Sequence, residues 1–105
     1  MTNRIDQLKK ILDTDPDDPF CLYGIAFEYH KQREFETAVR YYDQVILADP
    51  DYLYAYYHKA KALEMMGEID AAKSTLVDGL TRAEKLRDEK ATSELSDFLD
   101  SLKGD

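Results

Sequence analysis

The stretch Asp15-Pro16-Asp17 returns 34 residues later as Asp49-Pro50-Asp51. The same offset aligns further pairs of similar residues, which are Phe20 with Tyr54, Tyr23 with Tyr57, Ala26 with Ala60, Phe35 with Ile69 and Ala38 with Ala72. A fixed period of this length is the signature of a repeat protein, in which each unit buries its apolar face against its neighbours. The chain of 105 residues therefore holds two full repeats with a flanking segment at each end.

Each repeat has the pattern of two amphipathic helices. After Pro19 an apolar stripe follows the helical period, and after the polar break at residues 31–34 a second stripe begins at Phe35. Pro50 ends the second helix because the residue before a proline avoids helical dihedral angles. We expect the carboxylate of Asp49 or Asp51 to cap the helix that follows. The second repeat has the same two stripes, separated by Gly67, a residue suited to a left-handed helix end.

Shorter apolar stripes flank the two repeats. One of them precedes Pro16 (Ile5, Leu8, Ile11, Leu12), and the other has the polar outer face of a solenoid cap (Ala91, Leu95, Phe98, Leu99, Leu102). Glu84 stands where a third proline would fall, so we expect the fifth helix to run to about Leu86. The sequence thus predicts an all-α domain of about six helices over residues 1–105. Its parts are an N-terminal half-repeat helix (1–15), repeat 1 (19–52), repeat 2 (53–86) and a C-terminal capping helix (87–105).

Composition excludes several classes of protein. Hydrophobic residues make up 44% and charged residues 34% of the chain, with 4 Gly and 3 Pro, which suits neither disorder nor an all-β sandwich. The net charge of −8 repels phosphate, so we expect no nucleic-acid or membrane partner. One cysteine excludes a disulfide framework, and no apolar leader or membrane-spanning stretch occurs, so we expect a cytoplasmic protein.

The two-helix unit resembles the tetratricopeptide repeat. The family pattern is W-x2-L-G-x2-Y followed by A-x3-F-x2-A-x4-P, and repeat 1 offers Leu22-x2-Ile25-Ala26-x2-Tyr29 and then Ala38-x3-Tyr42-x2-Val45-x4-Pro50. The order of segments looks like that of short stand-alone bacterial members. Lys59 departs from the pattern at a position that is usually apolar, so we expect either that its stem lies along the stripe or that repeat 2 packs loosely there. The resemblance implies a right-handed α-solenoid of antiparallel helix pairs, a protein-binding role and no catalysis.

A second stripe on the first helix of each repeat is the candidate binding surface. It lies roughly 130° round the helix from the core stripe, by the period of 3.6 residues per turn. The resemblance implies that these helices line a concave face, so the stripe predicts an aromatic groove for a peptide or helix of a partner protein. The expected partner-binding residues are Phe20, Tyr23, Phe27, His30, Tyr54, Tyr57, His58, Lys61 and Met65.

Two alternatives to this groove stay open. The aromatic stripe also suits packing between neighbouring repeats. The protein also suits self-assembly as a homodimer, through the same groove or through the N-terminal half-repeat, with Ile5, Leu8 and Ile11 pairing across a two-fold axis. Some members of the family hold acidic chaperone tails with lysines and asparagines. The matching positions here carry neither, and Lys31 and Lys61 leave only a weak preference for an acidic group.

Signals for chemistry are weak. Asp13, Asp15 and Asp17 alternate as in a calcium loop, but the glutamate that such a loop needs is replaced by Gly24. His30 and His58 sit on equivalent helices and lack a clear third metal ligand. Cys21 has the setting of an inert hydrophobic residue. With no nucleophile elbow, phosphate loop or dinucleotide motif, we predict no enzymatic activity, no metal and no cofactor.

Overall fold

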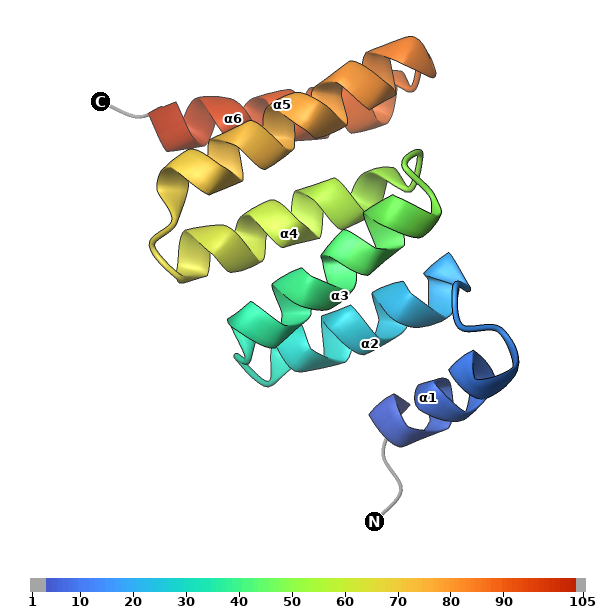
Figure 1. Ribbon diagram of the computed structural model, residues 1–105. Helices are drawn as coiled ribbons and strands as arrows, with labels where there is room; N and C mark the ends of the chain where they lie inside the picture. The colour runs from blue at the N-terminus through green and yellow to red at the C-terminus, as the bar shows by residue number, and fades with distance from the viewer. Residues whose placement is uncertain (1–3, 104–105) are drawn as a thin grey trace.

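The computed structural model describes residues 4–103, which form six α-helices joined by short turns (Figure 1). The helices are α1 (Arg4–Thr14), α2 (Pro19–Lys31), α3 (Phe35–Ala48), α4 (Leu53–Met65), α5 (Ile69–Lys85) and α6 (Glu89–Lys103). No strand occurs in this part of the chain. The outer ends of the first and last predicted segments, residues 1–3 and 104–105, lie outside the described residues, and the division into repeats stays a prediction.

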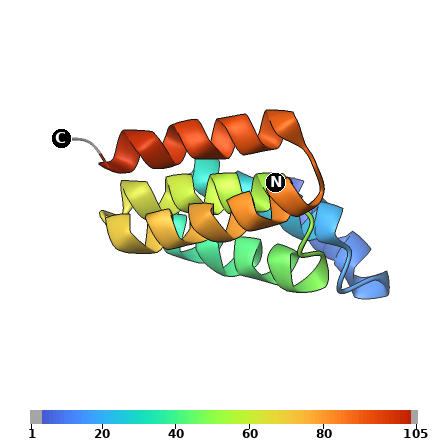
Figure 2. The same ribbon diagram turned by 90° about the horizontal axis from the view of Figure 1, so that it is seen from above.

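The helices stack in two layers. Each helix packs against the next one in the chain, and α4 also approaches both α2 and α6, whereas α1, α3 and α5 do not approach one another closely. Figure 2 shows α2, α4 and α6 toward one side of the stack and α3 and α5 toward the other. Because neighbouring helices are closer together on the α2, α4 and α6 side, that side is the concave one. The fold is the predicted all-α, right-handed solenoid of antiparallel helix pairs.

Small residues at the helix crossings explain the close packing. Seven alanines of the described helices are fully buried, namely Ala26, Ala38, Ala55, Ala60, Ala62, Ala72 and Ala83. The largest continuous core joins α4, α5 and α6 around Leu76 and Leu95, and it includes Phe98. The capping helix therefore covers an apolar surface that the second repeat cannot bury alone.

The N-terminal helix belongs to the fold rather than to an open face. Ile5 and Leu8 are 6% and 5% exposed, and they pack against Cys21 and Ile25 of α2. Only Ile11 of the three residues expected at a two-fold axis is well exposed, at 47%. The expectation that this half-repeat offers an apolar face for dimerisation is therefore wrong for Ile5 and Leu8, because α2 already covers them.

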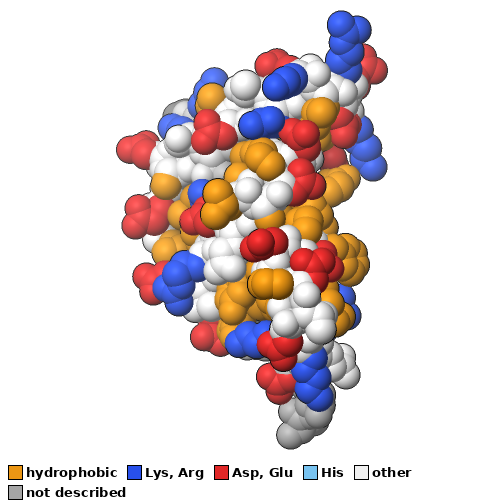
Figure 3. Space-filling view, turned by 45° about the vertical axis from the view of Figure 1, so that its right-hand side comes forward, with side chains coloured by type: hydrophobic (Ala, Val, Ile, Leu, Met, Phe, Trp, Pro, Cys, Tyr) orange, Lys and Arg blue, Asp and Glu red, His pale blue; other side chains and the backbone are white. Residues whose placement is uncertain are grey.

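Charged side chains of both signs are interspersed over the face formed by α3 and α5, and hydrophobic side chains gather along the side where α2 and α4 begin (Figure 3). The structure also shows how Lys59 fits at a position that is usually apolar in the family pattern. Its side chain is 23% exposed, and its Nζ lies 2.6 Å from Oδ1 of Asp43. The stem is therefore covered while the ammonium reaches a carboxylate, which is the first of the two expectations.

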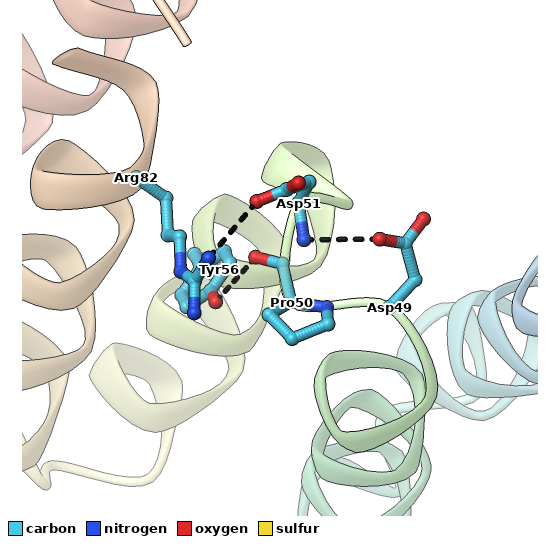
Figure 4. Close-up of polar contacts among 5 residues, drawn as sticks. All are labelled: Asp49, Pro50, Asp51, Tyr56 and Arg82. Carbon is cyan, nitrogen blue, oxygen red and sulfur yellow. Dashed lines mark hydrogen bonds and ion pairs between the residues drawn. The ribbon is translucent and has the colours of Figure 1, made fainter. Parts of the chain in front are cut away.

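The prediction that Asp49 or Asp51 caps the helix after the loop is wrong. Neither Asp49 nor Asp51 caps α4, because the cap position is Tyr52, whose side chain makes no capping hydrogen bond. Instead Oδ1 of Asp49 accepts a hydrogen bond from the Asp51 amide at 3.0 Å, and Oδ1 of Asp51 lies 3.2 Å from Nη1 of Arg82 (Figure 4). The hydroxyl of Tyr56 donates to the carbonyl of Pro50 at 2.6 Å. The loop is therefore held to α5 through Asp51 and to α4 through Tyr56.

Candidate functional site

Aromatic and histidine rings from α2 and α4 form one cluster on the concave side. The ring of His58 lies at the centre, with ring centroids 5.6 Å from Phe27, 5.8 Å from Tyr23 and 5.4 Å from Tyr57. All four side chains are half-buried. The rings therefore pack against one another and still present part of their area to the groove, which joins the two interpretations left open by the sequence.

His30 and a buried tyrosine form the floor of this cluster. The Nδ1 atom of His30 and the hydroxyl oxygen of Tyr42 are 3.1 Å apart, and the ring centroids of His30 and His58 are 6.2 Å apart. Tyr42 is fully buried, so His30 satisfies a hydroxyl that has no access to water. Sequence reasoning placed Tyr42 in the core stripe and missed this bond, since helical periodicity does not reveal where a hydroxyl points.

Both histidines are held in the neutral form. Burial lowers the pKa of His58 to about 4, with further lowering by His30 and Lys61. Burial, followed by the charge of Lys61, also lowers the pKa of His30. Burial raises the pKa of Tyr23 to about 12. At neutral pH the floor of the groove is therefore uncharged, and it suits apolar or aromatic groups.

Two lysines reach the cluster, Lys31 with its Nζ 5.5 Å from the ring centroid of Phe27, and Lys61. The Nζ atom of Lys61 lies 5.3 Å from the ring centroid of Tyr57 and 5.0 Å from that of Phe98. Phe98 belongs to α6 and was expected only as a core residue of the cap. The ring cluster is thus extended across three helices, with the ammonium resting on two rings.

The other predicted residues lie toward the two ends of the groove. Phe20 and Tyr54 stand near the amino-terminal ends of α2 and α4, where their side chains are 63% and 50% exposed. The exposure of Phe20 excludes the alternative that it is a core residue. Met65, 50% exposed, stands at the carboxy-terminal end of α4. Tyr23, Phe27, His30, Tyr57, His58 and Lys61 are therefore brought together, and Phe20, Tyr54 and Met65 flank them.

Two hollows adjoin the cluster, and Lys61 lines both. The first, of about 250 Å³, lies at the carboxy-terminal ends of α2 and α4, beside His30 and Phe35. The second, of about 430 Å³, lies between α4 and α6, beside Tyr57. A third, of about 450 Å³, is lined by residues of α3, α4, α5 and the loop between α3 and α4, including Leu47, and is separate from the ring cluster.

The described residues give no sign of a metal site or of a membrane span. Among residues 4–103 no three His, Cys, Asp or Glu side chains are grouped to hold a metal ion. The thiol of Cys21 is buried and lies 3.4 Å from Oδ2 of Asp18, the residue whose Oδ1 caps α2. Burial raises the pKa of this thiol, which disfavours a reactive thiolate. No helix in the described range is both long enough and apolar enough to cross a bilayer.

Comparison with known proteins agrees with this architecture. The family model described as tetratricopeptide repeat matches residues 29–87. A tetratricopeptide repeat domain protein from Salinibacter ruber has 33% sequence identity, with 86% of this chain and 91% of that chain covered and a TM-score of 0.79. Among curated proteins none matches the chain.

Two more distant structures share the fold. One is the type III secretion chaperone SycD of Yersinia enterocolitica in complex with a peptide of the translocator YopD, with 19% identity, 94% and 76% coverage and a TM-score of 0.84. The other is the TPR2B domain of yeast Sti1 in a pHsp70 complex, with 20% identity, 94% and 79% coverage and a TM-score of 0.87. The family model spans more than half of this chain, and the Salinibacter protein shares a third of its aligned residues over most of both lengths. The chain therefore belongs to the tetratricopeptide repeat family.

Proposed function

We propose that the protein is a non-catalytic interaction module that holds a peptide or helix of a partner protein along its concave face. The observation that carries this proposal is the half-buried ring cluster around His58, built from α2 and α4 and flanked by exposed Phe20 and Tyr54. Aromatic side chains contribute large contact areas at a low cost in conformational entropy. Histidines that stay neutral at pH 7 allow an apolar ligand group to approach without burying a charge.

The similar structures support this use of the fold. The SycD structure contains a peptide of a translocator, and the Sti1 structure is a complex with pHsp70. Both share with this chain an arrangement of helices over most of its length. The proposal transfers only the class of ligand, a segment of another protein, and leaves its identity to experiment. It also places the protein in the cytoplasm, where a buried free thiol such as that of Cys21 stays reduced.

The test is a quantitative capture of partners from native lysate followed by mass spectrometry. The wild type is compared with the variant Phe27→Ala/Tyr57→Ala, which removes two rings that contact His58. The matched control is Leu47→Ala/Val77→Ala, which removes two exposed apolar side chains, 85% and 50% accessible, on α3 and α5. Far-UV circular dichroism checks that each variant remains helical.

We expect a protein that is enriched by the wild type and by the control but lost with the groove variant. A partner retained by a helical groove variant would show that the ring cluster is not the binding site. If the wild type recovers only itself, self-assembly through the groove replaces the proposal, and sedimentation at several concentrations then measures the dimer. A chain that stays monomeric at high concentration would exclude that alternative.

A further inference from the structure

The two hollows beside the ring cluster differ in the sign of their charged side chains. The hollow at the ends of α2 and α4 is lined by three cations, Lys31, Arg33 and Lys61, and by one carboxylate, Glu64. The hollow between α4 and α6 is lined by Lys61 and by three carboxylates, Glu64, Glu94 and Asp97. Lys61 and Glu64 are common to both. What distinguishes the hollows is therefore the basic pair Lys31 and Arg33 in the first and the acidic pair Glu94 and Asp97 in the second.

The cations of the first hollow rest on rings. Nζ of Lys61 lies over the rings of Tyr57 and Phe98, and the guanidinium carbon of Arg33 lies 5.4 Å from the ring centroid of Phe35. Neither cation forms an ion pair with a carboxylate of the described chain. Lys31 differs, because its Nζ is 2.9 Å from Oε2 of Glu28. Arg33 and Lys61 are thus unpaired positive charges in a chain of net charge −8.

The carboxylates of the second hollow are equally free. Glu94 and Asp97 are exposed on α6, and within residues 4–103 neither forms an ion pair or a side-chain hydrogen bond. Both face a hollow whose other walls include Tyr57 and Phe98. Arg33 beside Phe35 and the two carboxylates beside Phe98 thus leave unpaired charges of opposite sign on two sides of the ring cluster. A ligand with charges in the complementary arrangement would be attracted to both sides.

We infer that the groove takes a segment of a partner protein that carries an acidic side chain, a bulky apolar side chain and a basic side chain in that spatial order. The acidic group lies at the end of α2 beside Arg33 and Lys61, the apolar group rests on the ring cluster, and the basic group lies against Glu94 and Asp97 of α6. This inference rests on the proposed function and specifies the chemistry of its ligand.

Continuity of the groove favours an internal segment over a chain end. Lys61 lines both hollows, so the groove continues in both directions from a carboxylate that is bound at Lys61. The rings of Tyr23 and Phe27 extend the surface farther along α2 toward exposed Phe20. A carboxylate held there therefore comes from an aspartate or glutamate side chain.

The test begins with a library of random short peptides displayed on phage and selected on the full chain. The selected consensus peptide is then synthesised with a fluorescent label, together with a permuted peptide in which its acidic and basic residues are exchanged. Binding of both is measured by fluorescence anisotropy. An exposed charge pair contributes up to about fivefold in affinity, so exchanging both pairs is expected to weaken binding by up to about 25-fold.

A charge-swapped protein provides the matched control. The variant Arg33→Glu/Glu94→Lys/Asp97→Lys changes exposed side chains only, and its thermal unfolding midpoint checks that the fold is kept. It is expected to prefer the permuted peptide over the original one. Reversal of the preference supports the inference.

Three outcomes overturn the inference. If the selected peptides need Phe27 and Tyr57 but show no charge order, or if the swapped protein keeps the original preference, the polarity is wrong while the groove stands. If the peptides bind Phe27→Ala/Tyr57→Ala as well as wild type, or if no peptide is selected, the proposed function fails as well. If a single-stranded oligonucleotide displaces the peptide, the cations serve a polyanion instead.

Discussion

Three turns that end helices share one backbone conformation but not one residue type. After α2, α4 and α5 the chain passes through the left-handed region at Arg33 (φ 64°), Gly67 (φ 79°) and Arg87 (φ 57°). In each turn the next amide donates to the carbonyl oxygen five residues earlier, at 2.9 to 3.0 Å. We predict that glycine is more stable than alanine at position 87 as well as at position 67.

The magnitude follows from the backbone alone. A Cβ atom in the left-handed region costs about 1–2 kcal/mol, and restriction of the unfolded chain returns about 0.4–1 kcal/mol when glycine is replaced by alanine. No heavy atom lies within 4 Å of a Cβ placed on Gly67, so packing adds nothing. The variant Gly67→Ala should therefore lose about 1 kcal/mol of unfolding free energy, the net of these two effects.

The assay compares pairs of variants that differ by one methyl group. Arg87→Gly and Arg87→Ala both remove the charge near the end of α5, so their difference isolates the backbone. We expect the glycine variant to melt about 4–8 °C higher by far-UV circular dichroism, the shift that about 1 kcal/mol produces in a domain of this size. At Ser74, exposed in the middle of α5, the order should reverse, because alanine is the better helix former by about 1 kcal/mol. Equal melting of the two Arg87 variants would refute the reasoning.

Two further perturbations test the packing of the helices and the state of the histidines. Gly79→Ala should lower the unfolding free energy by about 1–3 kcal/mol, because its Cβ would lie 2.8 Å from Cβ of Tyr56, close to the α4 backbone. Gly24→Ala should cost less, because its Cβ would meet the flexible end of Leu8 at 2.9 Å; similar urea midpoints for the two variants would contradict this. The pKa of His58 is about 4 in the folded protein and 6.5 ordinarily, so the unfolded state takes up the proton first. Stability should therefore be complete above pH 6.5 and fall as the pH approaches 4, with a shallower fall in His58→Gln; parallel profiles for the two proteins would argue against a neutral His58.

The period of the sequence was enough to predict the architecture. Repetition at 34 residues, together with apolar stripes of helical spacing, predicted six helices and placed Gly67 at a left-handed helix end, and the model agrees with both. It did not predict the same conformation at Arg33 and Arg87, because arginine carries no turn signal. At these two positions the packing of the flanking helices sets the dihedral angles, and the arginine adopts the left-handed conformation at an energetic cost.

The helix caps show how a correct period can still mislead at the level of single residues. Asp18 caps α2 through hydrogen bonds to the amides of Phe20 and Cys21. The residue 34 positions later is Tyr52, which has no carboxylate, so the second repeat lacks this cap although Asp51 stands next to it. A capping oxygen must belong to the residue directly before the helix. Asp51 lies one position too early to cap α4, and its carboxylate pairs with Arg82 instead.

The candidate site was predictable to the extent that it lies on a helix stripe. Tyr23 and Phe27 share a face of α2, Tyr57 holds the matching position on α4 with His58 at the margin of that stripe, and the structure brings the four rings together. The part supplied by α6 was not predictable, because the position of Phe98 under Lys61 depends on how the cap docks against α4 and α5. Local periodicity does not determine contacts between elements that are distant in sequence.

We predict that the half-buried rings serve both stability and recognition, whereas the exposed charged side chains serve recognition alone. The rings of Phe27 and Tyr57 are half-buried and contact His58, so their removal loosens the α2–α4 contact as well as any bound ligand. Arg33 and Glu94 are exposed and form no ion pair within residues 4–103, so changing their charge alters the field of the groove with little effect on folding. Variation at the charged positions would therefore change the preferred partner while the aromatic floor keeps the solenoid intact. Charge substitutions at Arg33, just after α2, and along α6 are for this reason the more discriminating probes of specificity, and ring deletions report on folding and binding together.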